Sequence, residues 1–184
     1  QFRKVKLDDG SGTFDMSTGQ NSYGRFQFFP DAITLHPGKY AIGVNTKNCK
    51  MMITPLAPDG GLTDDNTPMA LTFAGKALDY NGSNGRAGLL FSPVAITCSY
   101  DGTILVLEQA TSDNLNIARI QAFDLNGKPV SCFSDNNGPS PVLSLPGNVT
   151  YLDLVAVGDN LSTFLFVLYY SNAGDAPADY SMTI

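Results

Sequence analysis

The residue types that most often perform enzyme chemistry are few and scattered in this sequence. His36 is the single histidine among 184 residues, and Pro37 and Gly38 follow it. A histidine zinc site needs further ligands, and a Ser–His–Asp triad would have to enlist this one ring. There is no Gly-x-Ser-x-Gly segment to present a nucleophilic serine. We therefore expect His36 to be an exposed turn residue, and we predict no catalytic residue.

The three cysteines do not form a metal or redox motif. Cys49, Cys98 and Cys132 are odd in number and widely spaced, whereas such motifs place two cysteines close together in the sequence. The simplest interpretation is that they are small buried apolar side chains. A Cys98–Cys132 disulfide between neighbouring strands is the alternative. The cysteines do not indicate a cellular compartment, and we assign none.

Two acidic loops look superficially like calcium-binding loops. The segments "DDGSG" (8–12) and "GGLTDDNT" (60–67) both lack the alternating acidic ligands and the later glutamate that such a loop requires. Asp101, Asp124 and Asp159 lie next to expected turns, where a short carboxylate usually binds the local backbone. We therefore predict no metal site and no cofactor.

A group of tyrosines near the C-terminus is the best candidate for a contact surface. Tyr169, Tyr170 and Tyr180 flank the polar loop "SNAGDAPAD" (171–179). Tyrosine offers a flat apolar face and one hydroxyl, which suits recognition of a glycan or another protein. The alternative is that these rings pack within the sheet and that their hydroxyls reach its rim.

The charge balance excludes some classes of partner. The chain has 11 basic and 17 acidic residues and a net charge of -6, so it repels phosphate backbones and we expect no nucleic-acid partner. The longest apolar run is "TFLFVLYY" (163–170). Since a membrane-spanning helix needs about 18 apolar residues, we expect no membrane span.

The clearest secondary-structure signals predict an antiparallel meander in the second half of the chain. "VAITCS" (94–99) alternates between apolar and polar residues, and the turn at Gly102 needs a positive φ. "TILVLE" (103–108) is apolar on both faces, as expected of a strand between two layers. "RIQAFD" (119–124) and "PVSCF" (129–133) are the expected third and fourth strands.

Aromatic residues and glycines add detail to these strands. By default, Phe123, Phe164 and Phe166 are expected in the core, because strand aromatics are usually packed. Gly127 ends the turn after the third strand, and we expect it, like Gly102, to adopt a positive φ.

The same order of strands and turns recurs along the chain, which we interpret as a single domain over residues 1–184. The expected copies lie near residues 30–61, 93–133 and 151–184. A Gly-, Asn- and Asp-rich excursion (62–88) separates the first two copies.

The best copy resembles a known repeat. Asp101-Gly102, an apolar strand ending at Glu108, Arg119-Ile120-Gln121-Ala122-Phe123 and a turn ending at Gly127 resemble the NHL-type β-propeller repeat. The resemblance departs from the pattern at Ala118, where that family usually has Asn, and at Ser181, which replaces the arginine in the last copy. It implies an all-β fold of antiparallel propeller blades, of which this chain holds a part.

The resemblance implies two classes of function. The first is a non-enzymatic interaction or structural module with an unidentified ligand. The alternative is a fragment of a six-bladed propeller hydrolase of the lactonase type, because propellers host both. An unrelated β-sandwich is also compatible with the length. The last copy stops at Ile184, so we expect other blades of a longer chain, or further copies in a homo-oligomer, to cover its exposed edge and apolar face.

Overall fold

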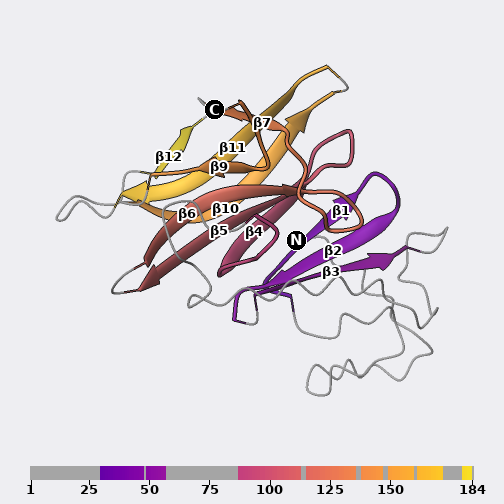
Figure 1. Cartoon of the computed structure of the whole chain (residues 1–184). Coiled ribbons are helices and arrows are strands. Elements are labelled where there is room, and N and C mark those ends of the chain that lie inside the picture. The colour runs from indigo at the N-terminus through magenta and orange to yellow at the C-terminus, as the bar shows by residue number, and fades with distance from the viewer. Residues whose placement is uncertain are drawn as a thin grey trace.

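The computed structural model describes residues 30–47, 49–56, 87–112, 115–135, 138–146, 149–159, 161–171 and 180–183. Every strand pair within these residues is antiparallel, and no helix occurs among them (Figure 1). The expected all-β, antiparallel architecture is therefore confirmed. Residues 1–29 and most of the 62–88 excursion lie outside the described residues.

Three antiparallel sheets make up most of the fold, and each consists mainly of strands that follow one another in sequence. The N-terminal sheet contains β1 (Ala32–His36), β2 (Tyr40–Asn45) and β3 (Lys50–Pro55). The central sheet contains β4 (Pro93–Cys98), β5 (Ile104–Ser112), β6 (Leu115–Phe123) and β9 (Val142–Ser144). The C-terminal sheet contains β10 (Val149–Gly158), β11 (Thr163–Ser171) and β12 (Tyr180–Thr183). A small hairpin is formed by β7 (Phe133–Asp135) and β8 (Gly138–Ser140).

The fourth strand of the central sheet is β9, so the prediction of residues 129–133 was wrong. After the turn, the chain makes a single bridge between Phe123 and Pro129. Pro129 has no N–H with which to extend the ladder. The chain then leaves the sheet, and β9 takes the place beside β6.

The central strand β5 is buried on both faces, as its sequence predicts. Leu105 and Leu107 face the C-terminal sheet in one core, whereas Ile104 and Val106 face the N-terminal sheet in a second core. The central sheet thus lies between the other two sheets (Figure 1). Burial of both faces explains why the first four residues of β5, Ile104 to Leu107, form a continuous apolar run.

The layers approach most closely at β4, which lies against β1 on one side and against β10 on the other. The Thr97 hydroxyl accepts a 3.2 Å hydrogen bond from the Ala156 N–H of β10. The side chain of Gln109 joins the same layers, because its amide donates to Val149 O at 2.7 Å and accepts from the Tyr151 N–H at 2.9 Å. Gln109 thereby occupies the place that a neighbouring strand would have beside β10.

Three polar side chains of β5 and β6 are completely buried together. Glu108 lies opposite Arg119 in the strand register, and Arg119 Nε donates to Glu108 Oε2 at 2.7 Å. Gln121 Nε2 also donates to Glu108 Oε2 at 2.7 Å. Because all three are at most 3% exposed, each needs partners for its polar atoms.

The segment before β4 supplies those partners. The Phe91 N–H donates to Glu108 Oε1 at 2.6 Å, and Leu89 O accepts from both Arg119 Nη2 (2.8 Å) and Gln121 Nε2 (2.7 Å). The Phe91 ring also lies 5.4 Å from the Arg119 guanidinium carbon. We call Glu108, Arg119 and Gln121 the buried polar cluster. It fastens residues 88–91 to the central sheet.

The two turn glycines adopt the expected conformation, with φ of 88° at Gly102 and 70° at Gly127. Gly102 has an additional constraint, because a Cβ there would lie 2.7 Å from His36 Nε2. No side chain fits at that distance unless the imidazole ring moves. Glycine is therefore favoured at position 102 for two reasons, the positive φ and the close approach of His36.

Replacing Gly102 by Ala should destabilise the protein by about 2–3 kcal/mol, because strain and the His36 contact add together. Gly138 is the matched control, since its φ is 110° but a Cβ added there would have nothing within 4 Å. Urea unfolding should show a larger loss of unfolding free energy for Gly102→Ala than for Gly138→Ala. In a His36→Ala background, the difference between these two losses should be smaller. Equal losses in both backgrounds would contradict the contact.

Replacing Arg119 by Met should cost about 3–5 kcal/mol, because it leaves the buried Glu108 carboxylate without its counter-ion. Burial raises the pKa of Glu108 above its ordinary value, against the opposing effect of Arg119. A raised carboxyl pKa contributes stability that is present at acidic pH and is lost as the pH rises through the raised value.

The deficit of Arg119→Met should therefore be smaller at about pH 5 than at about pH 8. The double variant Glu108→Gln/Arg119→Met should recover part of it, because no buried charge remains. Urea unfolding at both pH values measures the effect, and a deficit that does not depend on pH would contradict an ionised Glu108 in the variant.

Candidate functional site

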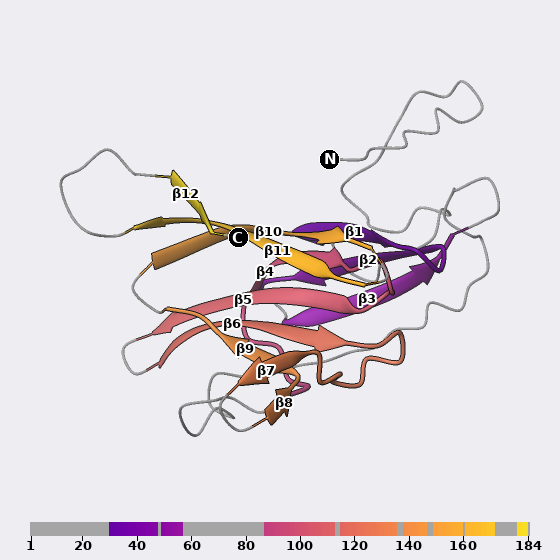
Figure 2. The same cartoon turned by 90° about the horizontal axis from the view of Figure 1, so that it is seen from above.

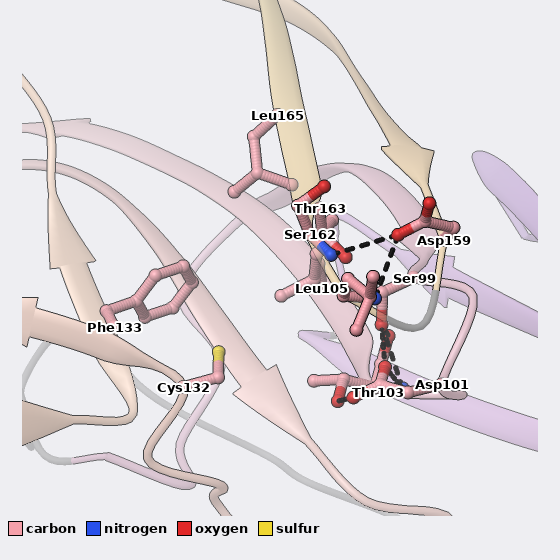
Figure 3. Close-up of a pocket in the computed structure, with 11 residues that line it drawn as sticks. Ser99, Asp101, Thr103, Leu105, Cys132, Phe133, Asp159, Ser162, Thr163 and Leu165 are labelled. Atoms are coloured by element: carbon pink, nitrogen blue, oxygen red, sulfur yellow. Dashed lines mark hydrogen bonds between the residues drawn. The ribbon is translucent and has the colours of Figure 1, made fainter.

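A cavity of about 340 Å³ opens between the ends of the central and C-terminal sheets. Its walls come from the β4–β5 turn, from the β10–β11 turn and from the segment that enters β7. Figure 3 shows Cys132 and Phe133 on one side of this cavity, across from the polar residues of the two turns. The polar residues are Ser99, Asp101, Thr103, Asp159, Ser162 and Thr163.

The two carboxylates of the cavity bind their own turns. Asp101 accepts hydrogen bonds from the Ser99 hydroxyl and from the Thr103 N–H (3.1 Å). Asp159 accepts from the N–H groups of Leu161 (2.8 Å) and Ser162 (3.1 Å). The expectation that these aspartates are turn residues is confirmed. It is confirmed for the third aspartate as well, since Asp124 Oδ1 accepts from the N–H groups of residues 126 and 128.

These hydrogen bonds determine the protonation of the carboxylates. The Ser99 hydroxyl and the Thr103 N–H lower the pKa of Asp101, and the backbone N–H groups of the second turn lower the pKa of Asp159. Both side chains therefore stay ionised over the neutral range and are weaker bases than ordinary carboxylates. Efficient general acids and bases have pKa values closer to the working pH.

His36 does not lie exposed in its turn, contrary to expectation, because it is 9% exposed and joins two sheets. Its Nδ1 accepts a 2.8 Å hydrogen bond from the Gly38 N–H, so the ring proton lies on Nε2, which is 2.8 Å from Gly102 O and donates to it. With both nitrogens occupied, the ring is not placed to activate a serine. Nothing in the sequence revealed this contact, since the two residues are 66 positions apart.

The cysteines are free thiols and do not form the alternative Cys98–Cys132 disulfide. Burial raises the pKa of Cys98 to about 12. Cys132 is exposed as a residue, but partial burial of its thiol and the nearby Asp101 charge raise its pKa. Since the thiolate is the nucleophilic form, neither side chain is activated.

The predicted tyrosine surface divides between two faces of the C-terminal sheet. Tyr169 faces the core, where its ring centroid is 5.8 Å from that of Tyr151. Tyr170 is the next residue on β11, so it points to the opposite, outer face and is half-buried. The Tyr180 side chain lies outside the described part of the structure. A role for the three rings in binding stays a prediction.

The outer face of the C-terminal sheet is apolar and exposed. The sequence led us to expect an uncovered apolar face on the last copy, but not which residues form it. The exposed fractions are 47% for Val155, 53% for Val157, 53% for Phe164 and 37% for Leu168, and Phe166 is half-buried. These five residues define the outer C-terminal face. Of the three phenylalanines expected in the core, Phe123 is buried there, whereas the expectation was wrong for Phe164 and Phe166, which lie on the outer face. Because "TFLFVLYY" is apolar on both faces, its pattern could not show which face is covered.

No protein-family model matches the chain, and no curated protein matches it. Within the described residues, no three His, Cys, Asp or Glu side chains are grouped as metal ligands would be. The part of the chain that the structure describes also contains no helix of the length and apolarity needed to cross a membrane.

Replacing Asp101 by Asn should flatten the acid limb of the stability profile. A lowered carboxyl pKa contributes stability that is present above the ordinary value and is lost as the pH falls through the lowered value. The melting temperatures of the wild type and of Asp101→Asn should therefore converge as the pH falls from about 7 to about 2. Ser99→Ala, which removes the strongest donor to Asp101, should also weaken the acid limb. Parallel curves for all three proteins would contradict this assignment.

Proposed function

We propose that the chain is a non-enzymatic interaction module built from NHL-like propeller blades, and that the outer C-terminal face is its contact surface. The exposed apolar side chains of this face carry the proposal. An exposed apolar patch of a few hundred Å² is often a site of interaction. Tyr170 extends the same face toward the end of β11 and could add a hydrogen-bonding hydroxyl.

The arrangement of the sheets supports the assignment to blades. The three meanders begin at Ala32, Pro93 and Val149, close to the starts of the three copies expected from the sequence. The first strand of the central sheet, β4, lies against the first strands of the other two sheets, β1 and β10, whereas β3 and β12 lie at opposite ends of the molecule (Figures 1 and 2). Radially arranged blades would bring first strands together and separate last strands in this way.

The use of the polar residues supports a non-enzymatic role. Glu108, Arg119 and Gln121 of the NHL-like motif satisfy one another and the backbone of residues 88–91. His36 joins two turns, and the cavity carboxylates bind their own turns. The motif that carries the resemblance is thus explained by packing, and it does not require a substrate.

One observation favours the alternative, a lactonase-type hydrolase. Asp101 and Asp159 come from two different sheets and line the same cavity, as catalytic carboxylates of a propeller would. Their lowered pKa values weigh against a role as general acid or base. Hydrolysis of simple lactones or esters that is lost in both Asp101→Asn and Asp159→Asn would favour the hydrolase over the interaction module.

The interaction module is tested by the binding of a neutral, polarity-sensitive dye to dilute protein. The dye should bind the wild-type chain, and Phe164→Asp should reduce binding severalfold without lowering the melting temperature. Leu35→Asp is the matched control, since Leu35 is 52% exposed on β1 of the N-terminal sheet. If the two variants bind the dye equally, the outer C-terminal face is not the contact surface.

A further inference from the structure

We infer that the outer C-terminal face binds the same face of a second copy of this chain, so that two copies form a dimer with two-fold symmetry. The inference rests on the proposed function, because it names the partner of the same contact surface. In a two-fold interface each copy contributes the same patch, and the contact leaves no further copy of that patch exposed.

The geometry of the face suits packing against another sheet. Val155 lies opposite Phe166 and Val157 lies opposite Phe164 in the register of β10 and β11. Cross-strand pairs of valine and phenylalanine give a row of apolar side chains on each strand. Two such faces can interdigitate at the usual separation of about 10 Å. The inner face of the same sheet already packs on the central sheet in this manner.

The charge of the face favours a second copy over a charged partner. Residues 149–171 contain no Lys or Arg, so the face offers no cation to an anionic membrane. Asp153, opposite Leu168, is the acidic residue at an outward position of the paired strands. A second copy needs no charge complement at an apolar sheet face, although its net charge of -6 opposes association over longer distances.

The size of the face predicts a weak dimer. The 10 residues of β10 extend about 34 Å, and the two strands β10 and β11 give a face of about 300 Å² per copy. Two copies would bury about 600 Å² by this footprint, below the range of about 1,200–2,000 Å² for stable complexes. We therefore expect a reversible dimer with a dissociation constant in the micromolar range or above, rather than a permanent one.

The N-terminal sheet offers a poorer surface for the same contact. Ile33 and Leu35 are exposed on β1, but Ala41 and Met52 on the corresponding face of β2 and β3 are at most 4% exposed. A partner there would contact one edge strand and not a whole sheet face. The outer C-terminal face is therefore the better candidate for a self-complementary interface.

Sedimentation velocity of the full chain, from about 1 µM to about 1 mM, tests the dimer. The average mass should rise from monomer to dimer with concentration, and added salt should shift the midpoint to lower concentration because it screens the acidic copies. Phe164→Asp should weaken association at least tenfold, and Val155→Thr, which keeps shape and strand propensity, should weaken it severalfold. Leu35→Asp should dimerise like wild type.

Several results would overturn the inference. A chain that stays monomeric at all concentrations but still binds the dye through Phe164 would exclude the dimer and leave the proposed function intact. A dimer lost in Leu35→Asp but not in Phe164→Asp would assign association to the N-terminal sheet. Binding of the monomer to neutral lipid vesicles through Phe164, without dimerisation, would show that the face takes a lipid surface instead.

Discussion

The burial of the central sheet on both faces is the constraint on which the rest of the structure depends. A strand such as β5, with Leu105 and Leu107 on one face and Ile104 and Val106 on the other, cannot leave either face in water without losing much of the hydrophobic stabilisation. One layer must therefore cover each side. The N-terminal and C-terminal sheets provide these layers, and both lie against β4.

Burial creates a second requirement where the apolar pattern of the sheet is interrupted. The face of the central sheet that carries Val106 and Phe123 also carries three buried polar side chains, Glu108, Arg119 and Gln121. Their polar atoms could be satisfied only by one another and by a backbone segment brought to them. The connection that precedes β4 is therefore held by the same groups that give the sequence its resemblance to an NHL repeat. The residues that carry this resemblance are explained by packing and hydrogen bonding, and they do not indicate a catalytic activity.

Local features of the fold were predictable from the sequence. The two-sided burial of β5, the turn aspartates and the positive φ of Gly102 and Gly127 follow from the pattern of neighbouring residues. Non-local features were not predictable. The position of β9 beside β6 and the contact of His36 with Gly102 join distant segments. The exposure of Phe164 depends on what packs against a sheet, and a strand that is apolar on both faces does not encode this.

The candidate site was predictable to the same limited degree. The sequence indicated Tyr169 and Tyr170 as neighbours on one strand, but alternation of side chains places them on opposite faces. It also indicated the two cavity aspartates as turn residues. It could not bring them to one cavity, since residues 101 and 159 meet only when two sheets are stacked.

The separation of the fold into meanders has a mechanical consequence. The ladder hydrogen bonds run within each sheet, and the layers are joined by side-chain packing and by a few bonds such as those of Gln109 and Thr97. A force that pulls the C-terminal sheet away from the central sheet therefore breaks few hydrogen bonds and leaves every strand pair intact. The resistance of the molecule to such a force is low across the layers and high along the strands, so the layers can peel apart before any sheet unravels.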